Sequence, residues 1–155
     1  MTPGDTLAGA DLPSGPDTPV RTRPSELPVP TSPLVLVVDD DQNAREGLAE
    51  YLVGCGYRVS EASDGPEALR KAIRRRPDLV LLDLAIPRLD GWTVARTLRA
   101  DPVFACVPVV ALSGLDYPDE KLRAAESGCD AFVSKPCDPL RLLETIRMLL
   151  AARRV

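Results

Sequence analysis

The chain has 155 residues, a formal net charge of −4 and no histidine. This balance offers no basic surface for nucleic acid or an anionic membrane, and the lack of histidine argues against histidine-based catalysis and zinc binding. The four cysteines show no C-x-x-C spacing, so we expect isolated, reduced thiols. No apolar run is long enough to span a membrane, and the first residues are unlike a signal peptide, so we expect a cytoplasmic protein.

Proline is unevenly distributed along the chain. Eight of the 16 prolines lie in residues 1–33, a stretch without aromatic residues and with few apolar ones. Such a segment buries too little apolar surface to offset its ordering entropy, so we expect a disordered or polyproline-II-like extension. Residues 34–155 have the length of one domain. Since nothing foldable lies on either side of them, we expect a single-domain protein with no attached output domain.

Short apolar runs alternate with helical patterns from residue 34 onward. The runs that predict strands are 34–38, 57–61, 79–82, 107–112 and 131–134. The first, third and fourth are continuously apolar, as in strands buried on both faces, whereas the second alternates like an edge strand. Amphipathic spacing predicts helices over 43–54, 66–76, 92–100, 118–127 and 139–153.

Each predicted helix should bury one face. The residues expected to point inward are Ala44, Leu48 and Leu52, then Ala68, Leu69, Ala72 and Ile73, then Ala95 and Leu98, then Leu122 and Ala125 with Ala124 as a further candidate, and finally Leu140, Leu143, Ile146, Leu149 and Leu150. Asp41 and Asp64 are expected to cap the first two helices, because aspartate after a strand commonly accepts from free helix N–H groups.

The strand-helix order predicts an α/β fold, a doubly wound five-stranded parallel sheet with helices on both faces. Five strands are too few for a (β/α)₈ barrel. Neither glycine-rich nucleotide-binding motif is present, which argues against a nucleotide site. Open sheets of this kind bind their ligands at the carboxyl ends of the strands.

Charged and hydroxyl side chains follow the predicted strands at that edge. Asp39, Asp40 and Asp83 would meet there, and such close carboxylates do not all stay ionised without a counter-ion. Mg²⁺, with Mn²⁺ as an alternative, suits an acidic site with room for water. Lys135 adds a mobile cation and Ser113 a hydroxyl donor. A carboxylate nucleophile, a divalent ion, a lysine and a hydroxyl are what phosphoryl transfer to an aspartate requires.

At these residues the sequence resembles the response-regulator receiver family, from residue 34 to about residue 152. The segments that carry the resemblance are 37–41, 78–91, 108–114 and 128–136. Each is weak alone, but together and in order they are specific. The resemblance implies a flavodoxin-like (βα)₅ fold with strand order 2-1-3-4-5. It also implies a phosphoprotein of a two-component or phosphorelay system.

The resemblance assigns roles at the matching positions. Asp83 would accept a phosphoryl group from a phosphohistidine, so the chain would be a phosphoacceptor signalling domain that catalyses only its own phosphotransfer and dephosphorylation. Asp40 would bind Mg²⁺ directly, Asp39 through water, and Ala85 through its backbone carbonyl. Lys135 would pair with the acidic site and then with the phosphoryl group.

The resemblance also implies a switch and its partners. Ser113 would move to the phosphoryl group, Phe132 would change rotamer, and the Lys135–Pro136 peptide would be cis. The output face would comprise the helix 118–127, the strand 131–134 and the helix 139–153, where a downstream protein target would bind. The donor would be a sensor histidine kinase or a histidine phosphotransferase. The chain would be a monomer or a phosphorylation-dependent dimer, and the first helix, around Ala44, Arg45 and Leu48, and the loop 136–139 would select partners.

Two alternatives remain open. A phosphatase of the haloacid dehalogenase type would use Asp39 and Asp41 as an Asp-x-Asp motif, but it leaves Asp83 unexplained. A receiver-like module that is never phosphorylated would act only as a docking surface. Within the family, Ala85 and Leu115 are apolar at positions that are often polar, which implies altered access of water to the phosphoryl group.

Overall fold

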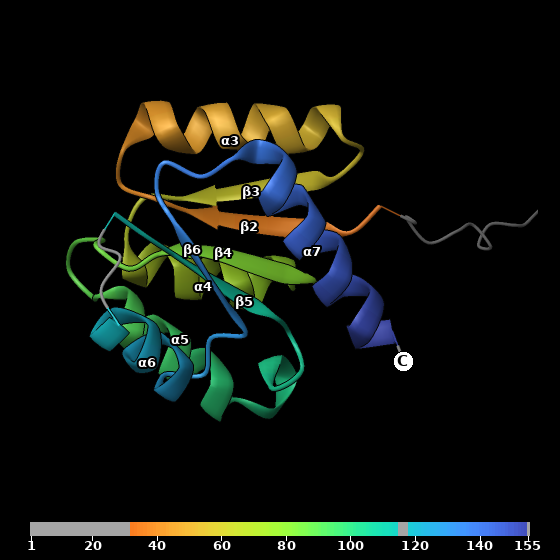
Figure 1. The fold of residues 1–155 in the computed structure, drawn as a ribbon. Helices are drawn as coiled ribbons and strands as arrows, with labels where there is room; N and C mark the ends of the chain where they lie inside the picture. Colours follow the sequence, from red (N-terminus) through yellow and green to blue (C-terminus); the bar gives the residue numbers. More distant parts are fainter. Residues whose placement is uncertain (1–31, 115–117, 155) are drawn as a thin grey trace, which may run out of the picture. The chain divides into compact units, whose positions relative to one another are not determined.

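The computed structural model describes residues 32–114 and 118–154 of the chain. Residues 1–31 of the expected proline-rich extension (residues 1–33) and Leu115 lie outside these residues, so the expectations about them stay predictions. The compact unit that the structure describes begins at Pro33. Figure 1 shows its central parallel sheet between two groups of helices.

The strands and helices alternate along the chain as predicted. The strands are β2 (Leu34–Val38), β3 (Arg58–Ala62), β4 (Leu79–Asp83), β5 (Val109–Ser113) and β6 (Ala131–Ser134). The helices are α3 (Gln42–Gly54), α4 (Gly65–Arg75), α5 (Gly91–Ala100), the short 3₁₀ helix η2 (Pro102–Phe104), α6 (Pro118–Glu126) and α7 (Pro139–Arg154). The fourth strand begins two residues later than predicted, at Val109, after Pro108, which has no N–H to donate to a ladder.

All neighbouring strands are parallel, and the five-stranded sheet has the order β3-β2-β4-β5-β6. This is the predicted order 2-1-3-4-5, with the alternating strand β3 at an edge. The three central strands are buried along their whole length, which accounts for their continuous apolar sequences.

Alternate residues of the central strands face two helix layers. On one side, α4 and α5 pack on the sheet through a cluster that includes Leu36, Val38, Val80, Leu82, Ala68, Ala72, Val94 and Leu98. On the other, α3 and α7 pack through a cluster that includes Val35, Val37, Leu79, Leu81, Leu52, Leu142 and Ile146. The sheet is therefore held rigidly from both faces, and its carboxyl edge presents the loops where the polar residues lie.

Some predictions of inward-facing residues were wrong. The residues expected inside but exposed in the structure are Ile73, Leu122, Ala125 and Leu140. Ala124, the further candidate in α6, is buried as expected, with 1% of its surface exposed, and in α7 Leu142 is buried with 0% exposed. Each lies about 160–200° around its helix from Leu122 or Leu140, because successive residues differ by about 100°. In α4 the small residues Ala68 and Ala72 contact the sheet, which leaves Ile73 outside that contact.

Aspartates cap four helices at the carboxyl edge, including α7, where the Asp138 side chain accepts from the Leu140 N–H at 3.0 Å. The Asp41 side chain accepts from the N–H groups of Asn43 and Ala44, so its predicted capping role is confirmed. Asp64 caps α4 as predicted, accepting from the Glu67 N–H at 2.7 Å. Asp90 caps α5 in the same way. Their capping bonds leave Asp39, Asp40 and Asp83 as the aspartates that gather at the strand ends.

Candidate functional site

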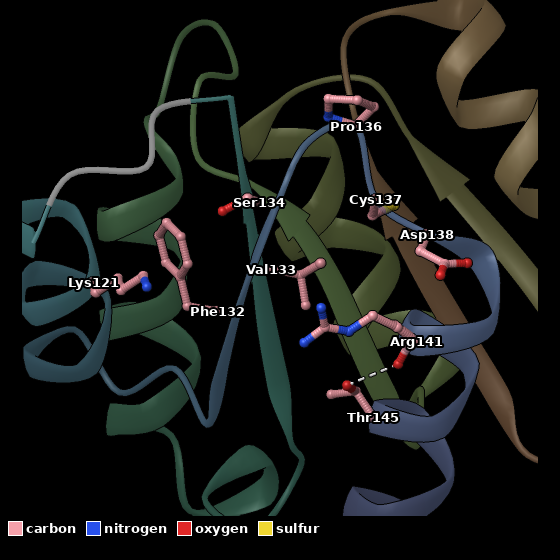
Figure 2. Close-up of a pocket in the computed structure, with 9 residues that line it drawn as sticks. All are labelled: Lys121, Phe132, Val133, Ser134, Pro136, Cys137, Asp138, Arg141 and Thr145. Carbon is pink, nitrogen blue, oxygen red and sulfur yellow. Dashed lines mark hydrogen bonds between the residues drawn. The ribbon is translucent and has the colours of Figure 1, made fainter.

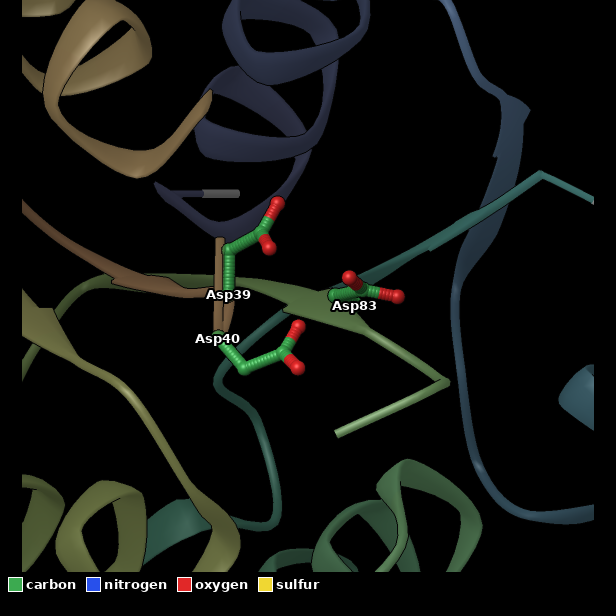
Figure 3. Close-up of side chains that lie close together, drawn as sticks. All are labelled: Asp39, Asp40 and Asp83. Carbon is green, nitrogen blue, oxygen red and sulfur yellow. The ribbon is translucent and has the colours of Figure 1, made fainter. Parts of the chain in front are cut away.

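Three aspartates meet where β2 and β4 end. Asp39 directly follows β2, Asp83 is the last residue of β4, and these strands are neighbours with Val38 opposite Leu82. Asp40 is the next residue along the chain. Each of the three offers a carboxylate oxygen within 4.8 Å of the others, and Figure 3 shows the carboxylates projecting to one side of the strand ends.

Asp39 is almost fully buried, with 3% of its surface exposed, and both of its carboxylate oxygens have partners. Oδ1 accepts from the Asp41 N–H at 2.9 Å, and Oδ2 accepts from the Lys135 ammonium at 2.9 Å. Its backbone N–H donates to the Ala62 carbonyl. These bonds compensate for the removal of a carboxylate from water.

Asp83 is buried to a similar degree but has weaker compensation. Its Oδ1 accepts from the Ala85 N–H at 3.0 Å, and its Oδ2 lies 3.3 Å from the Lys135 ammonium. Burial raises the pKa of Asp83 above its ordinary value and the charge of Asp39 adds to this, while the Ala85 N–H and Lys135 oppose it. The negative charge of Asp83 is therefore only partly compensated by its neighbours. A bound cation would complete this compensation, and the carboxylate could then react with an electrophile.

Lys135 bridges the two buried aspartates from the end of β6. Burial of the ammonium lowers its pKa, but the hydrogen bond to Asp39 and the charges of Asp83 and Asp39 outweigh burial, so the pKa of Lys135 is raised overall. Its backbone N–H donates to the Ser113 carbonyl at 2.7 Å, which ties the ends of β5 and β6 together. The Lys135–Pro136 peptide is cis, as predicted.

The other predicted site residues surround this cluster. Ser113, the last residue of β5, has 5% of its surface exposed and lies opposite Ser134 in β6. Ala85 is exposed and uses its N–H on Asp83. The proposed role of its carbonyl as a metal ligand, and that of the Ser113 hydroxyl toward a phosphoryl group, stay predictions.

Phe132 lies half-buried in β6, between the core and a surface groove. It packs against a small cluster that contains Leu84 and Trp92, and it lines a groove of about 490 Å³ between α6, β6 and α7. Figure 2 shows Lys121 of α6 and Arg141 of α7 on opposite sides of β6. The groove therefore spans the three elements of the predicted output face.

The donor set fits a hard divalent cation. It consists of carboxylate oxygens only, two buried and one on the exposed Asp40, where water can complete a coordination shell. Mg²⁺ takes oxygen ligands and usually keeps several waters. Asp39, Asp40 and Asp83 are the residues that would hold it.

Sequence reasoning missed one residue that reaches the site. Arg45 was expected at a partner surface, but only 15% of its side chain is exposed. Its guanidinium donates to the Asp39 backbone carbonyl at 2.9 Å and pairs with Glu61 in β3. A bond to a backbone carbonyl leaves no signal in side-chain types, so the sequence could not have indicated this contact.

The comparisons with known proteins decide the family. A family model described as the response regulator receiver domain matches residues 35–147. The chain belongs to this family. Receiver domains are phosphoacceptor signalling domains of two-component response regulators, and this excludes the dehalogenase-type phosphatase.

The relatives differ in length. The response regulator PleD of Caulobacter vibrioides is 41% identical over 115 residues, which are 74% of this chain and 25% of PleD. The transcriptional regulatory protein PrrA of Mycobacterium tuberculosis is 41% identical over 123 residues, which are 79% of this chain and 52% of PrrA. The receiver chain thus spans between a quarter and about half of these curated relatives.

Solved receiver structures cover the same part of the chain. The chemotaxis response regulator CheY4 of Vibrio cholerae has a TM-score of 0.73 and 30% identity, covering 77% of this chain and 99% of CheY4. The signal receiver domain of a histidine kinase from Syntrophus aciditrophicus has a TM-score of 0.73 and 32% identity, covering 78% and 92%. The receiver domain thus makes up nearly the whole of these solved chains, but only part of PleD and PrrA.

Proposed function

We propose that Asp83 accepts a phosphoryl group from a phosphohistidine donor, in a Mg²⁺-dependent reaction, and that the phosphorylated receiver changes its affinity for a partner. The observation that carries this proposal is the meeting of the buried Asp83 with Asp39, Asp40 and Lys135 at one edge of the sheet. The donor would be a sensor histidine kinase or a histidine phosphotransferase.

The chemistry needs an oriented carboxylate and neutralised charge. An Asp83 oxygen attacks phosphorus, the P–N bond to the donor imidazole breaks, and that nitrogen keeps the bonding pair. The Ala85 N–H fixes Oδ1, which leaves Oδ2 facing the Lys135 ammonium. Lys135 then stabilises charge on the phosphoryl oxygens. Mg²⁺, when bound, would neutralise further charge, and Asp39, Asp40 and Asp83 would hold it.

The proposed output face is the one formed by α6, β6 and α7. The Ser113 hydroxyl would bond to the phosphoryl group, and Phe132 would turn between the core and the groove. The position of Phe132, half-buried and lining the groove, supports this proposal. A nearly complete shift of a two-state surface needs a differential binding energy of about 5.5 kcal/mol, and charge-assisted hydrogen bonds to a phosphoryl group can contribute to it.

The test is intact-mass spectrometry after incubation with acetyl phosphate and Mg²⁺. We expect the receiver to gain about 80 Da, the mass of one phosphoryl group, to lose it in hydroxylamine, and to gain nothing with EDTA in place of Mg²⁺. Asp83→Asn should abolish the adduct. Asp119→Asn, which changes an exposed acid in α6, is the matched control and should leave it intact.

An adduct that survives Asp83→Asn would overturn the assignment of the phosphoacceptor. A parent chain without any adduct would favour the alternative of a docking module that is never phosphorylated. In that case the structure would still present the groove, but no chemical event at Asp83 would control it.

The remaining expectations are not tested by the fold. The described residues contain no helix that is both long and apolar enough to cross a membrane. The single-domain organisation, the cytoplasmic location and the monomer or phosphorylation-dependent dimer stay predictions. So does the absence of nucleic-acid binding, since RpaA of Synechocystis, 36% identical over 118 residues, is described as a DNA-binding regulator of which the chain spans 49%.

A further inference from the structure

The direction of the Asp40 side chain depends on the peptide that joins it to Asp39. Asp40 is exposed, and within residues 32–114 and 118–154 no recorded hydrogen bond reaches its carboxylate. The Asp39 side chain, in contrast, is fixed by Asp41 and Lys135. The Asp39–Asp40 peptide plane therefore decides whether the Asp40 carboxylate stays with the other two.

Arg45 holds this peptide plane from the first turn of α3. Its Nη1 donates to the Asp39 carbonyl oxygen at 2.9 Å, and this oxygen belongs to the Asp39–Asp40 peptide. On the other side of the same residue, the Asp39 N–H donates to Ala62 at 3.0 Å. Both the N–H and the carbonyl of Asp39 are thus hydrogen-bonded. The carbonyl, which belongs to the peptide before Asp40, is bonded by the Arg45 side chain.

The guanidinium of Arg45 is itself held in place. Its Nε donates to Glu61 Oε1 at 3.0 Å, and Glu61 lies in β3 opposite Val37 of β2. The Glu61 carbonyl accepts from the Lys71 ammonium of α4, which also pairs with Glu67 at 3.4 Å. A chain of contacts thus runs from α4 through β3 and α3 to the end of β2. A planar guanidinium presents separate N–H groups to the carboxylate and to the carbonyl in a fixed fork, a geometry that the single, shorter ammonium of lysine does not match.

We propose that Arg45, anchored by Glu61, is a positioning residue for the cation: it orients the Asp39–Asp40 peptide so that the Asp40 carboxylate stays within reach of Asp39 and Asp83. Arg45 touches no reacting atom and acts through the backbone. The inference rests on the proposed function, since it concerns the metal that phosphoryl transfer requires.

A positioning role of Arg45 and a purely electrostatic role predict opposite effects of its removal on metal affinity. Arg45 is a cation close to a site for a cation, so removing its charge alone should tighten metal binding. If Arg45 orients Asp40, its removal should weaken metal binding in spite of the more negative site. Residues that orient metal ligands typically contribute about 10–100-fold to metal affinity.

The experiment measures Mn²⁺ binding to the full chain by the electron paramagnetic resonance of free Mn²⁺, with Mg²⁺ as competitor. We expect Arg45→Gln to weaken binding about tenfold. Arg45→Lys, which keeps the charge, should bind more weakly than the parent. Arg70→Gln removes the charge of an exposed arginine in α4 and is the matched control, with binding unchanged. Circular dichroism melting curves ensure that each variant is folded at the temperature used.

Binding by Arg45→Gln that equals or exceeds that of the parent would overturn the inference. If Arg45→Gln does not fold, Arg45→Lys decides, and unchanged binding by that variant would overturn it equally. The proposed function fails separately, when the parent binds no Mn²⁺ or when Asp83→Asn and Asp40→Asn bind as the parent does. If the parent binds Mn²⁺ at these aspartates and the Arg45 variants bind it equally well, only the positioning role is refuted.

Discussion

At the carboxyl edge of the sheet the buried Asp39 and Asp83 share one cation, Lys135. At the amino edge one arginine, Arg99, donates to a single aspartate and to four backbone carbonyls. Arg99, in the last turn of α5, donates to Gly128, Phe104, Ala105 and Val107 and pairs with Asp130 at 2.8 Å. The same Asp130 oxygen accepts from the Val109 N–H where β5 begins. Every charge at this position has partners.

The difference lies in how fully each buried charge is compensated by its partners. Asp83 has a raised pKa because burial is not fully compensated, and an acidic cluster of this kind is a cost to the folded state. Arg99 has the opposite character, because its bonds join α5, η2 and the turn before β6. Substitutions at the two edges should therefore change stability in opposite directions.

The largest effect is expected at the amino edge. Arg99→Met leaves four carbonyls and the Asp130 carboxylate without this donor, so we expect the free energy of unfolding to fall by about 3 kcal/mol. Urea denaturation followed by circular dichroism measures it. Arg70→Met, at an exposed position of α4, should stay within about 0.5 kcal/mol of the parent. A loss below about 1 kcal/mol for Arg99→Met would show that water replaces the lost bonds.

A smaller loss of stability is expected where α5 touches the end of β4. A Cβ at Gly91 would lie 2.6 Å from the Leu84 Cα and 3.0 Å from the Asp83 carbonyl, so α5 would have to move. We expect Gly91→Ala to destabilise the receiver by about 2 kcal/mol, measured by urea denaturation. It should also slow the proposed phosphorylation of Asp83, measured by mass spectrometry.

The matched substitution is Gly47→Ala, also in a helix. A Cβ at Gly47 has no atom within 4 Å, so we expect a gain of about 0.5–1 kcal/mol because alanine favours the helix. Equal effects of the two substitutions would contradict the close approach of α5 to the end of β4.

The composition of the acidic cluster could be predicted because it depends on side-chain types at the strand ends, whereas the sheet order was implied by the resemblance to the receiver family. Helix caps such as Asp64 were predicted, because local sequence indicates them, but long-range contacts with backbone carbonyls and Cα atoms were not. The bonds of Arg99 and Arg45 to carbonyls, and the contact of Gly91 with Leu84, depend on tertiary geometry alone. The inward faces of α6 and α7 were mistaken at Leu122 and Leu140 because each helix carries apolar residues around more than one face.

At the carboxyl edge a substitution should stabilise the metal-free protein. The folded state binds the Asp83 proton more tightly than the unfolded chain, so this contribution to stability is present below the ordinary aspartate pKa of about 4 and is lost as the pH rises through the raised pKa of Asp83. The Asp83→Asn variant cannot ionise at this position, so its stability does not fall in this way as the pH rises. We expect it to equal the parent near pH 4 and to be more stable by about 1 kcal/mol near pH 7.

Urea denaturation in EDTA across that pH range measures the difference. Added Mg²⁺ should then reduce or reverse it, because a cation that binds only the folded parent stabilises it by mass action. A difference that does not vary with pH would show that packing, and not the charge of Asp83, separates the two proteins.

The smallest effect is expected from an ion pair at the amino edge that has fewer hydrogen bonds than Arg99. Arg153 lies 3.1 Å from Asp78, with 32% and 38% of their side chains exposed, and Asp78 also accepts from the Leu34 N–H. We expect Arg153→Gln to lower the free energy of unfolding by about 0.5 kcal/mol, and this loss should shrink in about 0.5 M NaCl, where charges are screened within a few ångströms. The loss in Arg99→Met should persist in salt, because its partners are mainly carbonyls. Equal salt sensitivity of the two losses would mean that charge, and not hydrogen bonding, stabilises this edge.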